Sequence, residues 1–217
     1  LGRGLSLDIE INTETGQIES NRRYGVANTH ILAHGHHLVA LEEGSHPFSI
    51  NPQTLGSEGY GRYADGINGA MTAHPKIDPE TGELHGFGYM TDHFASETMT
   101  YHVIDRAGRM LRSDVFEAPY AAMVHDFMIT RDYVIIPLFP LTCDLDRIAQ
   151  FGFPFAFDRN AGAYIGVLKR GAPVSSIRWL EAPVCYVFHY LNAWNEGSKV
   201  IFDSVDFPVA PNFPNAD

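Results

Sequence analysis

The sequence predicts an all-β protein, and three observations support this fold class. Short runs of β-branched and aromatic residues alternate with turns rich in Gly, Pro, Asn and Asp, and almost no stretch shows the 3.6-residue period of an amphipathic helix. A hairpin pattern also recurs along the chain. The ranges expected to form strands or hairpins are 30–43, 89–105, 126–139, 163–170 and 198–207.

The recurring hairpin pattern places an Ile before Asn or Asp and then a turn. The four Ile residues are Ile11, Ile50, Ile77 and Ile104, at successive gaps of 39, 27 and 27 residues. A strand–turn–strand unit that returns at intervals of tens of residues is typical of β-propellers and other stacked β arrays. An ordinary meander sandwich with similar turns is the alternative.

One segment departs from the β pattern. We expect one helical turn over residues 144–150, followed by an aromatic loop that carries Phe151, Phe153, Phe155 and Phe157. Such a loop can cover an apolar pocket in an enzyme. The more ordinary interpretation is that it packs over the core.

Composition and charge narrow the class of partner. The chain has 217 residues, of which 45% are hydrophobic, so it can bury a sizeable core. Its formal net charge of -11 argues against a nucleic-acid or anionic-membrane partner. No run of 18 apolar residues and no signal-peptide layout is present. Cys143 and Cys185 have no zinc-ribbon or redox spacing, so we expect reduced thiols in a soluble cytosolic protein, with a disulfide between them as the alternative.

Eleven histidines are an excess, and most of them have ordinary surroundings. On a strand, His34 and His36 would face one side and His37 the other, so this cluster offers at best two metal ligands, and we interpret it as a solvated hairpin. Four further histidines, flanked by polar or turn residues, need no special role: His46, His85, His93 and His102.

His74, His125 and His189 have a different neighbourhood. Each lies where an apolar run meets a turn, and the gaps between them are 51 and 64 residues. In a radial fold each such junction lies at the inner end of a different blade, so the three side chains can converge on the axis. Three hydrogen-bonded core histidines are the alternative.

Three ordered motifs around these histidines resemble the carotenoid cleavage oxygenase superfamily. They are TAHPKIDPETGEL at 72–84, MVHDFMIT at 123–130 and FHYLNAW at 188–194, and the likeness runs from about Gly25 to Phe207. The resemblance implies a seven-bladed β-propeller with Fe(2+) on its axis, held by four histidines. Motif by motif, the first three ligands are His74, His125 and His189.

The resemblance also implies that residues 1–217 form one partial propeller domain with about four of the seven blades. No histidine follows His189, so the fourth ligand is expected in residues beyond this sequence. The superfamily places glutamates against its ligand imidazoles, and Glu43 corresponds to the first of them. A carboxylate in that place fixes the tautomer and orientation of a histidine. The alternative for Glu43 is an exposed turn residue.

The implied activity is O2-dependent cleavage of an alkene C=C bond into two carbonyl products, with no organic cofactor. The stretches 134–148, 163–171 and 177–183 are most similar to the lignostilbene-type bacterial branch, which implies a stilbene or phenylpropanoid substrate. A carotenoid or apocarotenoid is the alternative. That branch carries a Lys, which binds the phenol of the substrate, where this chain has Glu42, and a carboxylate there would repel a phenolate. Phe151, Phe153 and Phe155 are candidates for lining the pocket.

Two other classes of function remain open on the sequence. A propeller that serves only as a binding scaffold would retain its histidines for packing. A β-rich zinc hydrolase would use a chelating HxH or HExxH motif, but the single HxH, at His34 and His36, lacks a third partner.

Overall fold

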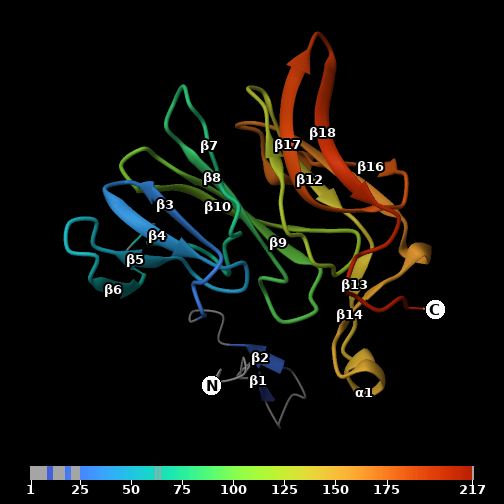
Figure 1. The fold of residues 1–217 in the computed structure, drawn as a ribbon. Coiled ribbons are helices and arrows are strands. Elements are labelled where there is room, and N and C mark those ends of the chain that lie inside the picture. The colour runs from blue at the N-terminus through green and yellow to red at the C-terminus, as the bar shows by residue number, and fades with distance from the viewer. Residues whose placement is uncertain (1–8, 12–17, 21–24, 62, 64, 217) are drawn as a thin grey trace.

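The structure is a computed structural model that describes residues 9–11, 18–20, 25–61, 63 and 65–216 (Figure 1). It is nearly all β, as the sequence predicts. The one α-helix is α1 (Arg147–Phe151), and the two 3-10 turns in the described residues are η1 (Arg159–Ala161) and η2 (Val174–Ser176). No helix in these ranges is long and apolar enough to cross a membrane.

Three four-stranded antiparallel sheets contain most of the described strand residues. The first contains β3 (His30–His34), β4 (His37–Leu41), β5 (Phe48–Ile50) and β6 (Ser57–Tyr60). The second contains β7 (Lys76–Ile77), β8 (Leu84–Tyr89), β9 (Thr98–Ile104) and β10 (Met110–Glu117). The third contains β11 (Met128–Ile129), β12 (Tyr133–Leu138), β15 (Ala163–Lys169) and β16 (Arg178–Ala182).

Three two-stranded hairpins complete the described strands. They are β1 (Ile9–Ile11) with β2 (Ile18–Ser20), β13 (Leu141–Cys143) with β14 (Phe155–Phe157), and β17 (Tyr186–Glu196) with β18 (Lys199–Phe207). The β13–β14 hairpin interrupts the third sheet between β12 and β15.

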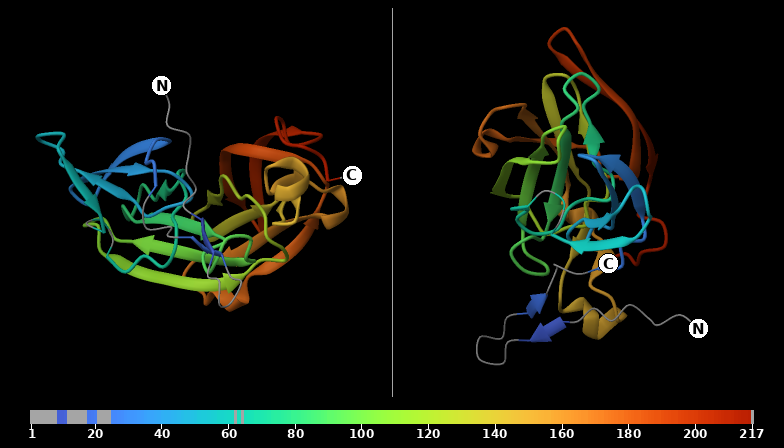
Figure 2. Two further views of the ribbon diagram at one scale, coloured as in Figure 1. Left: turned by 90° about the horizontal axis from the view of Figure 1, so that it is seen from below. Right: turned by 90° about the vertical axis from the view of Figure 1, so that its left-hand side faces the viewer.

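The sheets follow one another in an arc, from the blue-to-cyan first sheet through the green second sheet to the yellow-green and orange third sheet and the red β17–β18 hairpin (Figure 2, left). In every four-stranded sheet, hydrogen-bonded neighbours follow the chain order. Four-stranded meanders of this kind are the units of β-propellers. The expected four blades correspond to three complete meanders and one long hairpin.

The Ile–Asn/Asp pattern marks the ends of strands. Each of the four Ile residues is the last residue of its strand, in β1, β5, β7 and β9. Where the turn is described, the next side chain caps it: Asn51, Asp78 and Asp105 each accept two backbone N–H groups from the turn at 2.8–3.3 Å. A short polar side chain that satisfies turn donors is the reason Asn and Asp favour this position.

Apolar side chains from successive sheets form two core clusters. The larger lies between the second and third sheets and includes Phe87, Tyr101, Phe127 and Phe157. The smaller lies between the first and second sheets and includes Leu41 and Met71 among its buried members. Burial between sheets, rather than within one, holds the arc together.

The segment around α1 differs in part from the expectation. The helix spans Arg147–Phe151 instead of 144–150, and it ends where Gly152 adopts a φ of 68°. The aromatic loop prediction is wrong for Phe155 and Phe157, which lie in β14, paired with Cys143 and Leu141, and are 7% and 1% exposed. Strand pairing and burial therefore override the loop character.

Candidate metal centre

His74, His125 and His189 lie at the start of three successive β units. His74 lies two residues before β7, His125 lies three residues before β11, and His189 lies in β17. Strands β7 and β11 are edge strands of their sheets. The three side chains meet although 51 and 64 residues separate them.

The ring nitrogens of the three histidines converge on one point. Nε2 of His125 lies 3.0 Å from Nε2 of His74 and 3.2 Å from Nε2 of His189. The rings are steeply inclined to one another, at 64°, 73° and 84°. Within the part of the chain that the structure describes, this is the one group of three or more His, Cys, Asp or Glu side chains close enough to share a metal ion.

A local irregularity accompanies His189 in β17. The pairing of β17 with β18 shifts register between Val187 and Tyr190, and again between Tyr190 and Asn192. A bulge of this type bends a strand and re-aims its side chains. Here it lies at His189, whose side chain points toward His74 and His125 in an otherwise regular hairpin.

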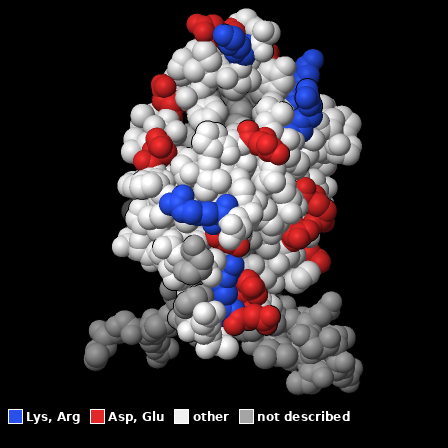
Figure 3. Space-filling view, turned by 90° about the vertical axis from the view of Figure 1, so that its right-hand side faces the viewer, with Lys and Arg blue, Asp and Glu red and all other residues white. Residues whose placement is uncertain are grey.

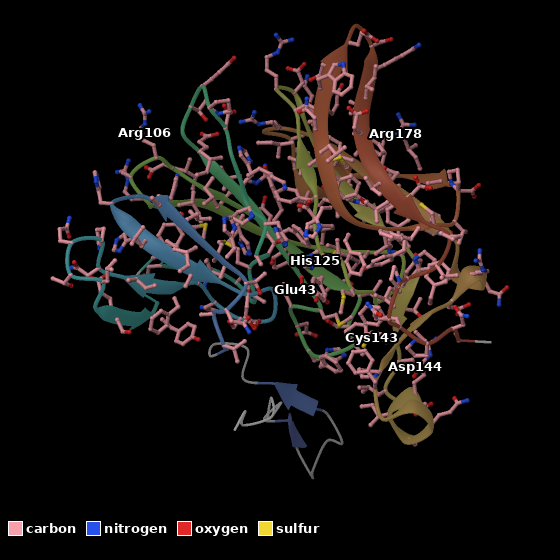
Figure 4. The ribbon with its side chains drawn as sticks, in the orientation of Figure 1. Glu43, Arg106, His125, Cys143, Asp144 and Arg178 are labelled. Atoms are coloured by element: carbon pink, nitrogen blue, oxygen red, sulfur yellow. The ribbon has the colours of Figure 1, made fainter. Side chains whose placement is uncertain are left out.

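Glu43 holds the other ring nitrogen of His125. Its Oε2 lies 2.6 Å from Nδ1 of His125, and its Oε1 accepts a hydrogen bond from Tyr89 Oη at 2.8 Å. With Nδ1–H donated to the carboxylate, the neutral His125 ring has a free lone pair on Nε2. Glu43 and His125 lie side by side in the centre of the molecule (Figure 4).

The loop that carries His74 is fixed from two sides. The backbone N–H of His74 donates to Thr72 Oγ1 at 3.0 Å. The ring of His30, in β3, stacks on His74 at 6.3 Å between centroids, and its Nδ1 lies 2.8 Å from the carbonyl oxygen of Ala73. A residue of the first sheet therefore positions the loop that leads into the second sheet.

The electrostatics of the site keep two of its three imidazoles neutral. Burial, with the nearby His125, lowers the pKa of His74 to about 4, and partial burial with the same neighbour lowers the pKa of His189. Burial also disfavours charge on His125, but the hydrogen bond and charge of Glu43 outweigh it and raise the pKa of His125. Two neutral rings and one ring held by a carboxylate are a suitable donor set for a metal.

The geometry fits a single transition-metal ion. Imidazole nitrogens bind such ions at about 2.1 Å, so two of them at right angles around one ion lie about 3.0 Å apart. The observed Nε2 separations of 3.0 and 3.2 Å match that spacing. Three lone pairs this close together repel one another unless a cation or a proton lies between them.

His34 and His37 lie in the β3–β4 hairpin, outside the three-histidine group. His34 and His37 pair across a two-residue turn in which Gly35 and His36 both have positive φ, which is typical of a tight hairpin. The expectation of a solvated hairpin is wrong for His34, because it is buried and its ring nitrogens contact Tyr63 Oη and the Gly82 carbonyl at 2.6 and 2.9 Å.

Two more histidines are buried, and one is exposed. His85 and His102 lie in the second sheet and are 2% and 0% exposed. His85 contacts Tyr101 Oη at 2.6 Å, and His102 contacts Ser113 Oγ at 3.0 Å. His93 is exposed beside Asp92. All three are satisfied by polar neighbours and lie outside the three-histidine group.

The predicted pocket residues occupy different places. Glu42 folds back on its own turn, where its Oε1 accepts the N–H of Gly44. Phe153 is 41% exposed and Phe155 is buried, and their rings lie 5.4 Å apart. Phe155 pairs with Cys143, which lies below and to the right of His125 in Figure 4. Among the described residues, the ring neighbours of Phe153 and Phe155 are other Phe side chains and not the three histidines. The Phe151 side chain lies outside the described residues. Cys143 and Cys185 form no disulfide with each other, as expected.

Three neighbours of the site are not predicted from the sequence. They are Tyr89, which donates to Glu43, His30, which stacks on His74, and Phe188, whose ring lies 5.9 Å from that of His125. Phe188 precedes His189 directly, so the third motif contained a signal for it. Tyr89 and His30 lie outside all three motifs, and only the packing of the sheets reveals them.

Comparison with known proteins identifies relatives along most of the chain. Isoeugenol monooxygenase of Pseudomonas nitroreducens is 39% identical over 193 residues, which are 88% of this chain and 40% of that protein. Lignostilbene-alpha,beta-dioxygenase isozyme III of Sphingomonas paucimobilis is 36% identical over 202 residues, 88% of this chain and 41% of that protein. The chain thus spans about 40% of the length of these relatives.

Solved structures and a family model agree with these relatives. The lignostilbene dioxygenase of Pseudomonas brassicacearum superposes with a TM-score of 0.84 at 34% identity, covering 91% of this chain and 42% of that one. Cobalt-substituted ACO of Synechocystis gives 0.73 at 28% identity, covering 94% and 43%. The family model described as retinal pigment epithelial membrane protein matches residues 6–217. The chain therefore belongs to the retinal pigment epithelial membrane protein family, in agreement with its resemblance to carotenoid cleavage oxygenases.

Proposed function

We propose that the protein containing this chain is a non-haem iron(II) oxygenase that uses O2 to cleave an alkene C=C bond into two carbonyl compounds. His74, His125 and His189 are its metal ligands in this chain. The observation that carries the proposal is the convergence of three Nε2 atoms at 3.0 and 3.2 Å, with Glu43 on the far nitrogen of His125.

The names of the relatives support this reaction class. Isoeugenol monooxygenase, lignostilbene dioxygenase and carotenoid 9,10-cleavage dioxygenase are all oxygenases named for alkene-containing compounds. The Synechocystis relative was solved in a cobalt-substituted form, which is in keeping with a metal site in that protein. Imidazole donors suit iron as well as zinc, copper and nickel, and iron is the first choice here because the relatives are named as oxygenases.

The residues of this chain have distinct parts in such a reaction. The iron would supply a Lewis-acidic site at which O2 meets the alkene. Neutral imidazoles add no negative charge, so the positive charge of the ion is retained. Glu43 holds Nδ1–H of His125 and thereby keeps Nε2 directed at the metal. Phe188 places an aromatic ring beside His125, where it excludes water from an apolar substrate.

We propose a phenylpropanoid alkene or a stilbene as the substrate. The isoeugenol and lignostilbene enzymes support this choice, while the similarity to apocarotenoid oxygenase supports an apocarotenoid as the second candidate. We propose that the negative charge of Glu42 determines how the site recognises a phenol. Phe151 and Phe153 stay candidates for the pocket, whereas buried Phe155 would act only by packing against Phe153.

Residues 1–217 are proposed to be one part of a single β-propeller, with a fourth ligand from elsewhere in the protein. A cytoplasmic location is proposed because neither Cys143 nor Cys185 is in a disulfide. On the face shown in Figure 3, acidic and basic side chains are interspersed without a continuous basic patch, in keeping with a small-molecule partner rather than a nucleic acid.

The test is made on the complete protein. Iron content, O2 uptake and aldehyde products are measured with isoeugenol, a 4-hydroxystilbene and an apocarotenoid. Stoichiometric iron with aldehyde from one of these supports the proposal. A folded protein that binds no iron and forms no aldehyde would instead be a binding scaffold. Zinc in place of iron, with hydrolysis of an ester, would support the hydrolase alternative.

A further inference from the structure

The carboxylate of Asp126 collects hydrogen bonds from three separate segments of the chain. Its Oδ1 accepts Lys76 Nζ at 2.7 Å and the backbone N–H of Phe127 at 2.8 Å. Its Oδ2 accepts the backbone N–H of Tyr190 at 3.2 Å. Asp126 is only 4% exposed, so its carboxylate is largely shielded from water.

The partners of Asp126 are the near neighbours of the three histidines. Lys76 lies two residues after His74, Asp126 directly follows His125, and Tyr190 directly follows His189. The segments belong to β7, to the approach to β11 and to β17, which are in three different sheets. One side chain therefore links the three chain segments that present the imidazoles.

Burying the Asp126 carboxylate has a cost in free energy that its partners must offset. A buried carboxylate is costly unless a cation and hydrogen-bond donors compensate it. Lys76 supplies the cation, with 29% of its side chain exposed against 3% for Asp126. The Tyr190 N–H reaches Oδ2 at the place where β17 departs from regular pairing with β18. Asp126 therefore fixes the backbone of the bulge that aims His189.

We propose that Asp126 is a positioning residue that sets the spacing of the three imidazoles, and through it the affinity and geometry of the metal site. This inference rests on the proposed metal centre. Asp126 acts through Lys76 and Tyr190 and is not itself part of the three-histidine group. Its role differs from that of Glu43, which holds a ligand ring directly, because Asp126 holds the backbone and the neighbours of the ligands.

Asp126→Asn is the direct test, since asparagine keeps the shape and one acceptor but replaces the other oxygen with a donor. Either Lys76 and Phe127 or Tyr190 then faces an N–H group. The complete, metal-free protein is titrated with Co2+, and its visible absorption reports both affinity and coordination geometry. We expect binding weaker by about tenfold or more, the scale known for outer partners of metal ligands, together with a changed Co2+ spectrum.

Asp78→Asn is the matched control. Asp78 is also buried, at 6% exposed, and it also accepts one cation, Arg170 at 2.5 Å, and two backbone N–H groups, from Glu80 and Thr81. Its partners do not lie beside the other two histidines. We expect Asp78→Asn to lower the thermal midpoint while Co2+ affinity stays within about twofold of the wild-type value.

A second pair of variants serves if Asp126→Asn does not fold. Lys76→Gln removes the cation and should weaken Co2+ binding several-fold, whereas Lys76→Arg keeps the charge and should restore most of the affinity. A wild-type protein that binds no Co2+ would overturn the proposed metal centre. If the Asp126→Asn variant binds Co2+ as tightly as the wild-type protein, the proposed role of Asp126 is overturned while the metal centre stands. An equal loss of Co2+ affinity in the Asp78→Asn variant would have the same meaning.

Discussion

Glu43 Oε2 lies 2.6 Å from His125 Nδ1, although 82 residues separate the two side chains. Glu43 follows β4 of the first sheet, and His125 precedes β11 of the third. Both side chains are about one-fifth exposed, at 21% and 19%. The pair therefore connects two sheets that share no backbone hydrogen bond, and it does so at the point where the imidazoles meet.

Glu43→Gln is expected to lower iron affinity by about 10- to 100-fold, because a neutral amide holds the His125 ring less firmly and makes it a weaker donor. Iron retained against a graded series of chelator concentrations measures the effect. Glu58→Gln is the control, since Glu58 contacts His37 at 3.5 Å in another Glu–His pair away from the site. Equal iron loss in both variants would contradict the assigned part of Glu43.

His125→Ala is expected to abolish aldehyde formation, because it removes the imidazole that lies within 3.2 Å of both other rings. His36→Ala should leave turnover unchanged, because His36 occupies a hairpin turn with a φ of 67°. Product formation and iron content are measured for both variants at matched folding, checked by circular dichroism. A similar loss of activity in both would show that the histidines are sorted wrongly.

The strands and turns were predictable because their signals are local. Ile50 ends β5, and Asn51 caps the following turn through bonds to residues two and three positions along. Phe155 was misassigned for the opposite reason. Its strand pairs with the segment at Cys143, 12 residues earlier, and the local sequence does not show that pairing.

The metal site was only partly predictable for the same physical reason. The motifs identified the three histidines, but the links among them depend on how sheets pack. Tyr89 reaches Glu43 across 46 residues, and Tyr190 reaches Asp126 across 64. Such contacts are set by the register and arc of whole sheets, and a single sequence carries no periodic signal for them.

Glu42→Lys is expected to improve turnover of 4-hydroxystilbenes, because a cation near the site attracts a phenolate that the native carboxylate repels. The substitution also removes the acceptor for the Gly44 N–H, so a stability loss of about 1 kcal/mol is expected. Glu42→Gln, which keeps an acceptor without charge, separates the two effects. Unchanged KM and kcat for 4-hydroxystilbene in Glu42→Lys would remove the charge argument.

Acid should destabilise the fold through buried neutral histidines outside the metal site. Burial lowers the pKa of His102 from 6.5 to about 4, and the Ala70 carbonyl opposes this only in part. His46 disfavours the charged ring further, while Asp114 favours it.

Between pH 6.5 and 4 the unfolded chain binds a proton at His102 that the folded protein excludes, so the free energy of unfolding falls as the pH falls. His102→Gln, in metal-free protein, should reduce that slope by up to about 1.4 kcal/mol per pH unit in urea titrations. An unchanged slope would mean that folding does not lower the pKa of His102, despite its burial and its contacts with Ser113 and Thr100 at 3.0 and 3.1 Å.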